Sequence, residues 1–251
     1  MEMWDLSILT SKHKQRYFIV CTLGLFCWYL LVGRVALLSD WQWGIHQLPM
    51  FLDQSVSFSA PWIVLYAYMY PQTAAPLFSM QHKRTMHRWL LGILIVYCIS
   101  TPIWLLYPVV RPENVIEANN AFEFWVQMIY FLDPASNCFP SMHVALSFYG
   151  AWTVQSMDKK LGNILLVGVL GIWYSTLALK QHWFVDGAVG IALVLVVDFF
   201  LCQKIPWLPE EKSHIPRKYH LYWFLPVVLV EVFFLLGTTI FWEELVPYLP
   251  N

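Results

Sequence analysis

Long apolar stretches separated by short polar segments dominate this chain. Seven of them approach the roughly 20 residues that a helix needs to cross a bilayer, at 16–38, 58–80, 89–109, 142–156, 162–180, 183–203 and 221–242. Two further stretches, 41–54 and 120–132, mix aromatic with acidic residues, which is more typical of helices that lie at the membrane interface. The pattern therefore predicts an all-α, polytopic membrane bundle.

The composition indicates that lipid is part of the solvent. Of the 251 residues, 59% are hydrophobic and only 12% are charged, and the mean hydropathy is +0.54. Soluble domains carry about 25% charged residues, and a core cannot hide this much apolar surface. The formal net charge of -1 and the lack of a basic tract argue against a nucleic-acid partner. We expect one integral membrane domain over residues 1–251.

Basic residues fall in alternate connections between the expected spans. Cytoplasmic loops carry an excess of Lys and Arg, and twelve of the fifteen basic residues lie before the first span or after the second, fourth and sixth. Seven spans with a cytoplasmic N-terminus satisfy this rule. The connections 109–141 and 180–183 then lie on the periplasmic or luminal face. That side keeps only Arg111 and Lys180, with Arg34 near the outer end of the first span.

Two histidines lie at the outer mouths of spans, where ionisable residues are costly and mark candidate functional sites. Asp186 follows His182 by four residues, so the two share one face of a helix. The carboxylate can then accept the imidazole Nδ1–H and leave Nε2 as a nucleophile. His143 follows Ser141 at the expected start of a span, where free backbone N–H groups can bind an anion. This arrangement predicts a phosphate site with His182 as nucleophile and His143 as acid.

These residues resemble the motifs of a known family. Pro-Ser-x-His followed by Ser-x6-His-x3-Asp is similar to the type 2 phosphatidic acid phosphatase superfamily of integral lipid phosphate phosphatases and lipid phosphotransferases. The matching positions here are Ser141, His143, Ser175, His182 and Asp186. The resemblance implies a six-helix catalytic core, about 58–203, plus one extra C-terminal span.

The resemblance also implies a mechanism. His182 would form a phosphohistidine and Asp186 would orient it. His143 would protonate the leaving group, and Ser141 would help to hold the phosphate. The substrate would be a membrane lipid, and neither a metal nor another cofactor would be required.

Two positions depart from the family pattern. Its first motif is Lys-x6-Arg-Pro, and here Arg111 fits the end of the motif while Trp104 takes the place of the Lys. The third motif has Arg after its Ser, and here that residue is Thr176. Lys180 could replace one missing cation. Because a phosphomonoester carries nearly two negative charges and a phosphodiester only one, a site with Arg111 and Lys180 favours diester or transferase chemistry.

The variant strings Pro-Ser-Met-His-Val-Ala and Lys-Gln-His-Trp-Phe-Val-Asp are most similar to the inositol phosphorylceramide synthase branch, which often transfers a phospho-headgroup between lipids or to a polyol. A simple lipid phosphate phosphatase is the alternative, because it shares the first half-reaction. A transporter that relays protons is a weaker hypothesis, since transporters favour inverted repeats and none is visible. A non-catalytic homologue is equally weak, because the triad is intact.

Other features leave their roles open. The 221–242 span either covers a face of the bundle or forms the contact of a homo-oligomer. Asp133, close to Asn137, either contacts an acceptor headgroup or caps a helix. Cys138 is expected to be structural, and the acids Asp198 and Glu231 are expected to be hydrogen-bonded inside the bundle.

Overall fold

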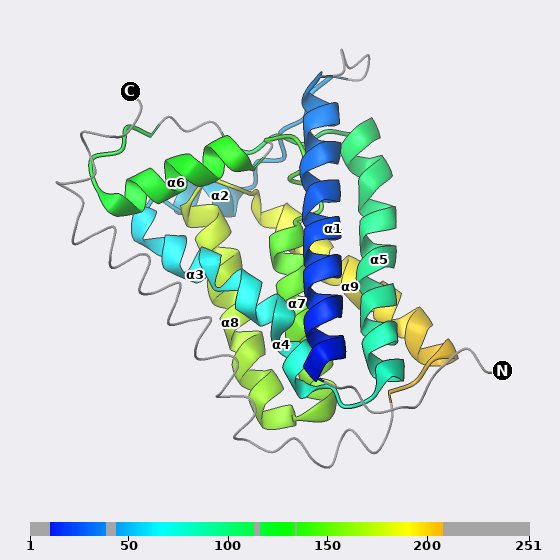
Figure 1. The fold of residues 1–251 in the computed structure, drawn as a ribbon. Coiled ribbons are helices and arrows are strands. Elements are labelled where there is room, and N and C mark those ends of the chain that lie inside the picture. Colours follow the sequence, from blue (N-terminus) through cyan, green and yellow to red (C-terminus); the bar gives the residue numbers. More distant parts are fainter. Residues whose placement is uncertain (1–10, 39–43, 113–115, 134, 208–251) are drawn as a thin grey trace.

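The computed structural model describes residues 11–38, 44–112, 116–133 and 135–207. This part of the chain is built from helices and holds no strand beyond isolated bridges, as predicted (Figure 1). The predicted 221–242 span and Glu231 lie outside it. The helices are α1 (Ser11–Leu38), α2 (Phe51–Ser55), the 3-10 helix η1 (Ala60–Trp62), α3 (Ile63–Ala67), α4 (Met69–Ser79), α5 (Lys83–Leu106), α6 (Ala121–Leu132), α7 (Met142–Met157), α8 (Lys159–Ala178) and α9 (Phe184–Lys204).

Helix α7 is the centre of the bundle and packs against α4, α8 and α9. Most of its residues are buried on every side, as expected of a helix with no polar face. It approaches α4 closely, and a Cβ on Gly150 would lie 2.5 Å from the Gln72 carbonyl oxygen. Helices α1 and α5 run side by side along the bundle (Figure 1).

Three helices in the described part of the chain are long and apolar enough to cross a membrane, namely α5, α8 and α9. Helix α7 is shorter, with 16 residues. All four occupy the expected 89–109, 142–156, 162–180 and 183–203 segments, with ends shifted by a few residues. The membrane orientation inferred from the basic residues stays a prediction.

The expected single span at 58–80 is divided into η1, α3 and α4. Pro71 explains the break between α3 and α4. A proline within a helix lacks the N–H that would bond the carbonyl four residues earlier, and its ring clashes with that carbonyl. The carbonyl concerned belongs to Ala67, the last residue of α3.

The expected interfacial helix at 41–54 is wrong for most of its described length, because residues 44–50 are not helical and only Phe51–Ser55 is helical. His46 instead pairs with the segment around Val109, donating its N–H to the Pro108 carbonyl and accepting from the Val110 N–H, both at 3.0 Å. The helix expected at 120–132 is confirmed as α6, capped by the Asn120 side chain.

A buried ion pair joins the start of α5 to the end of α9. The Arg88 guanidinium donates to Asp198 Oδ1 at 2.7 Å and to the Ile205 carbonyl at 2.7 Å. Trp152 Nε1 donates to the other Asp198 oxygen at 3.0 Å. The Arg88 side chain is 1% exposed, so losing its charge leaves an uncompensated carboxylate inside the bundle.

We expect Arg88→Met to lower the free energy of unfolding by about 3–5 kcal/mol, the usual cost of breaking a buried pair from one side. The double variant Arg88→Met/Asp198→Leu should recover most of this loss, because it removes both charges. Thermal and denaturant unfolding in detergent measure both effects. Lys160→Met, at an exposed position, is the control and should change stability by less than about 0.5 kcal/mol. An Arg88→Met protein as stable as the parent would contradict the prediction.

Candidate active site

The connection between α8 and α9 presents His182. The Thr176 carbonyl accepts the N–H groups of Gln181 at 2.9 Å and His182 at 3.3 Å. Lys180 takes a left-handed conformation with φ 54°, which lets the chain reverse within a few residues. This tight turn places the imidazole inside the bundle, where it is almost fully buried.

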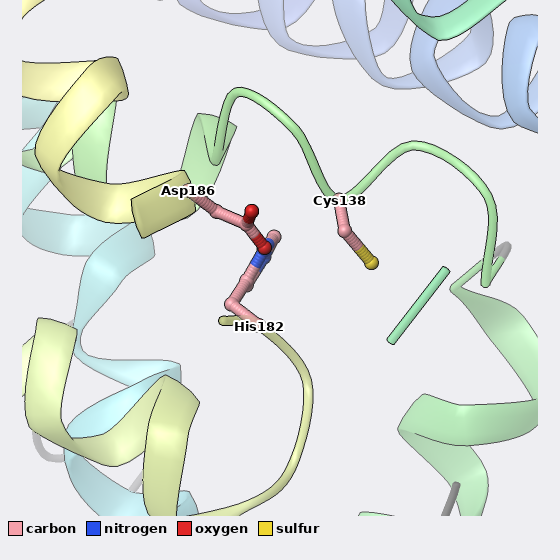
Figure 2. Close-up of side chains that lie close together, drawn as sticks. All are labelled: Cys138, His182 and Asp186. Atoms are coloured by element: carbon pink, nitrogen blue, oxygen red, sulfur yellow. The ribbon is translucent and has the colours of Figure 1, made fainter. Parts of the chain in front are cut away.

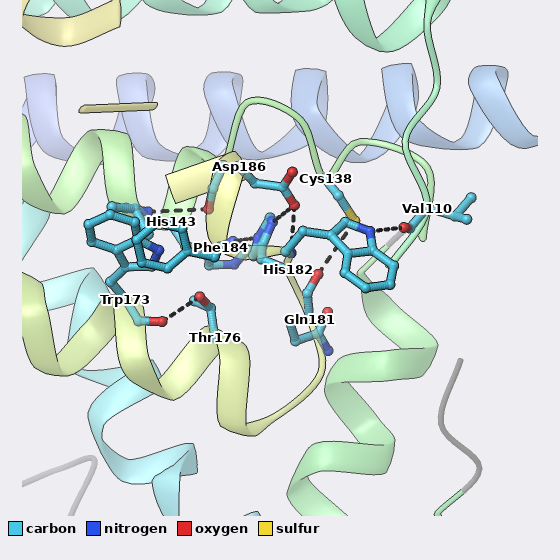
Figure 3. A network of polar contacts seen from close by, with 12 residues as sticks. Val110, Cys138, His143, Trp173, Thr176, Gln181, His182, Phe184 and Asp186 are labelled. Carbon is cyan, nitrogen blue, oxygen red and sulfur yellow. Dashed lines mark hydrogen bonds and ion pairs between the residues drawn. The ribbon is translucent and has the colours of Figure 1, made fainter. Parts of the chain in front are cut away.

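Asp186, in the first turn of α9, holds His182. One carboxylate oxygen, Oδ2, lies 3.2 Å from His182 Nδ1 and accepts the Trp183 N–H at 2.9 Å. The spacing of four residues therefore does place the two side chains together (Figure 3). Burial lowers the pKa of His182 to about 3, so the ring is neutral at physiological pH. With Nδ1–H donated to Asp186, the lone pair is on Nε2.

His143 lies in the first turn of α7, opposite His182. Its Nδ1 is 3.0 Å from His182 Nε2. The two motifs are also joined through the backbone, because the Ser141 N–H donates to the Asp186 carbonyl at 3.0 Å. Gly190 allows this approach, since a Cβ there would lie 2.8 Å from the Ser141 carbonyl oxygen. The structure thus brings the three predicted catalytic residues into one hydrogen-bonded row.

The other edge of His143 contacts residues from two further helices. Tyr66, on α3, places its hydroxyl 2.6 Å from His143 Nε2. Asp133, directly after α6, has Oδ2 3.5 Å from that hydroxyl and 3.8 Å from His143 Nε2. Burial raises the pKa of Asp133 to about 6, although hydrogen bonds from Tyr29 and Tyr66 and the nearby Arg111 charge lower it.

Residues 86–209 match the PAP2 superfamily. The matched segment contains His143, His182 and Asp186. The superfamily includes lipid phosphatases and phosphotransferases, which makes a phosphatase-type enzyme the general class. No curated protein and no solved structure matches the chain significantly.

The two cations expected to bind phosphate, Arg111 and Lys180, differ in their hydrogen-bond partners. Arg111 lies near Asp133 and Cys138, close enough for its charge to lower both pKa values. Its Nη2 donates to the Tyr130 carbonyl at 3.2 Å, and Nη1 is buried with no partner among the described residues. Lys180 donates instead to the Asp53 and Val56 carbonyls. The phosphate roles of both cations stay predictions.

Ser141 acts as the N-cap of α7, where its Oγ accepts the Val144 N–H at 3.4 Å. Its expected contact with phosphate also stays a prediction. Asp53 is a site residue that sequence reasoning missed, because no motif surrounds it. Its carboxylate accepts the Phe184 N–H at 2.7 Å and the Met50 N–H at 2.7 Å. It thereby fixes the 50–53 segment against the start of α9.

The chain departs from the family pattern at Trp104 and Thr176, and neither residue carries a charge. Trp104 is fully buried, with its ring edge-on to Tyr29 at 5.6 Å, and Tyr29 is in turn edge-on to His143 at 6.3 Å. Thr176 donates its hydroxyl to the Trp173 carbonyl at 2.7 Å and supports the His182 turn through its own carbonyl. Aromatic packing at Trp104 and backbone contacts at Thr176 therefore stand where the family pattern has cations.

Cys138 lies beside His182 and Asp186, and one ligand atom from each falls within 4.8 Å of the others (Figure 2). Metal binding requires a thiolate. Burial raises the pKa of the Cys138 thiol well above its usual value, and its Sγ donates to the Ala135 and Gln181 carbonyls, both at 3.4 Å. The His182 nitrogen and the Asp186 carboxylate already bind one another. This cluster fits a hydrogen-bonded site better than a metal centre.

An apolar groove runs from the PAP2 triad along the bundle. It has a cavity volume of about 170 Å³ and is lined by residues of α1, α4, α5 and α7, His143 among them. Its α5 wall extends from Tyr97 back to Trp89, a rise of about 12 Å along the helix. Polar groups are few, and they are mostly the hydroxyls of Tyr29, Tyr70, Thr73 and Tyr97.

Proposed function

We propose that this protein transfers a phospho-group from a membrane lipid through a phosphohistidine on His182, at the non-cytoplasmic face of the membrane. The observation that carries the proposal is the row Asp186–His182–His143, with contacts of 3.2 Å and 3.0 Å. It supplies a nucleophile, a group that orients it and an acid, which are the parts that covalent phosphoryl transfer requires.

The first half-reaction follows from this row. A phosphoester that binds between the two histidines replaces their hydrogen bond. His182 Nε2 attacks the phosphorus, the ester P–O bond breaks, and the leaving oxygen takes a proton from His143 Nδ1. Asp186 stabilises the positive charge that develops on the His182 ring. Arg111, with a buried unpartnered Nη1, is the cation best suited to contact the phosphate oxygens.

The second half-reaction needs a hydroxyl. His143 now accepts its proton, and its oxygen attacks the phosphorus and releases His182. A lipid or polyol hydroxyl makes the enzyme a transferase, and water makes it a phosphatase. We favour the transferase and a phosphodiester substrate. The neutral Trp104 and Thr176, and a Lys180 ammonium held by backbone carbonyls, leave few cations for a doubly charged phosphate.

The substrate's aliphatic chain would lie in the groove that ends at His143. The groove is apolar along its length and touches the reacting centre only at that residue. A lipid that enters between α1, α4 and α5 thus brings its phosphate to the histidines while its chain remains in an apolar environment. This favours lipids with long chains without selecting among diacylglycerol, sphingoid and polyprenyl types.

Labelled lipids separate the two outcomes. We expect purified protein, given a phosphodiester lipid labelled in its headgroup phosphate, to form a new labelled lipid only when ceramide or a polyol is added. A labelled monoester such as phosphatidate tests the alternative. Release of free phosphate at the same rate with and without acceptor would reject the transferase and leave the phosphatase. Turnover of neither substrate, while the protein remains folded, would reject both.

A further inference from the structure

Tyr66 and Asp133 form a second hydrogen-bonded arm on the side of His143 that faces away from His182. Tyr66 comes from α3 and Asp133 from the end of α6, so neither belongs to the helices that carry the triad. The His143–Tyr66 contact of 2.6 Å is one of the shortest side-chain contacts in the site. Tyr66 is 1% exposed, which leaves its hydroxyl no solvent to bind.

Packing and helix capping do not account for Asp133. It follows the last residue of α6, where the helix dipole disfavours a negative charge. Its side chain is only 13% exposed, with Oδ1 buried and unpartnered among the described residues, and the burial of such a group is costly. The groups that face it are Tyr29, Tyr66, His143 and the Arg111 charge. These groups surround Asp133 at the active site, where their hydrogen bonds and charge offset the cost of burying its carboxylate.

Reversing the hydrogen bonds in this arm converts it between two states that hold the same number of protons. In one state Asp133 is protonated and donates to Tyr66, and Tyr66 donates to a neutral His143 at Nε2. In the other state Asp133 is ionised, Tyr66 donates to it, and His143 carries protons on both nitrogens. One proton shifts from Asp133 to the Tyr66 oxygen and another from Tyr66 to His143.

We propose that Tyr66 and Asp133 are positioning residues that orient His143 and supply its proton. This inference rests on the proposed function, in which His143 protonates the leaving group. During the first half-reaction the leaving oxygen takes the Nδ1 proton while Nε2 receives one through Tyr66. Asp133 becomes a carboxylate, and the net change is one proton moved from Asp133 to the leaving group. The acceptor hydroxyl returns a proton to Nδ1 in the second half-reaction, and the arm is restored.

The need for a proton donor depends on the leaving group, which provides the test. As soluble probes of the first half-reaction, octyl phosphate releases octanol, whose alkoxide requires a proton, whereas p-nitrophenyl phosphate releases a stable phenolate. We expect Tyr66→Phe and Asp133→Asn each to slow the first half-reaction of octyl phosphate about 10- to 100-fold, at or below the lower limit of general-acid effects, because His143 itself is retained. Rapid-quench measurement with p-nitrophenyl phosphate should show a loss of less than about threefold. The double variant should be no slower than the worse single variant, because the two residues act as one unit.

Matched controls use the same substitutions elsewhere. Tyr174→Phe removes a hydroxyl from a partly exposed tyrosine on α8, and Asp158→Asn keeps a good N-cap for that helix. Neither should alter the rate with either substrate. Equal losses on both esters for Tyr66→Phe and Asp133→Asn, or no loss on octyl phosphate, would overturn the proposal. Retention of either activity in His182→Ala would instead reject the proposed function itself.

Discussion

Replacing His182 with alanine should lower the rate of lipid phosphoester turnover by at least about 10⁴-fold, because enzymes that lose their nucleophile lose nearly all covalent catalysis. The structure gives the substitution little other effect, since the polar contacts of the His182 side chain are with Asp186, His143 and the Cys138 backbone, all at the site itself. The N–H that shapes the turn belongs to the backbone and is retained. The measurement is turnover of a labelled lipid together with trapping of the labelled protein.

The trapped protein distinguishes loss of the nucleophile from loss of binding. We expect the parent to carry an acid-labile, alkali-stable phosphate after a short incubation and His182→Ala to carry none. Asp186→Asn should label slowly, because the imidazole keeps Nε2 but loses the carboxylate that orients it. His87→Ala, in the first turns of α5 at the other end of the bundle, is the control and should label normally. A labelled His182→Ala protein would disprove the phosphohistidine.

The helices and the triad could be predicted because each depends on local sequence. Apolar runs of 20 residues identify spans whatever their neighbours are, and this pattern located α5, α8 and α9 to within a few residues. His182 and Asp186 are only four residues apart, so the chain keeps them close, although His182 precedes α9 and only Asp186 lies on it. His143 and His182 are 39 residues apart, and their pairing was predicted because the expected topology puts both at the outer mouths of spans, with the family resemblance in agreement.

The rest of the site arises from contacts that the sequence does not encode locally. Tyr66 is one of several tyrosines in an apolar stretch, and only the packing of α3 brings it 2.6 Å from a histidine 77 residues later. Asp53 lies in a segment expected to be helical, yet it binds the N-terminus of α9. Lys180 has the charge expected of a phosphate ligand, but the position of its ammonium depends on where the 53–56 backbone lies.

The groove yields the second large effect, a loss of activity that depends on chain length. Leu146 lies about one turn after His143 on α7 and lines the groove. Leu146→Trp should therefore fill the space next to the triad. We expect turnover of long-chain lipid to fall about 100-fold while turnover of p-nitrophenyl phosphate changes less than about threefold. Val167→Trp is the control, because Val167 lies on α8 and is 68% exposed. It should change neither activity.

A series of soluble alkyl phosphates separates blocked binding from general distortion. Each methylene buried from water contributes about 0.8 kcal/mol, so kcat/KM of the parent should rise about fourfold per added carbon until the groove is filled. Leu146→Trp should end this rise at a shorter chain, whereas a distorted triad would lower every member of the series by the same factor. The soluble phosphates are essential here, since a chain that moves from lipid into an apolar groove gains little from desolvation. A parent enzyme indifferent to chain length would mean that the groove does not bind the substrate.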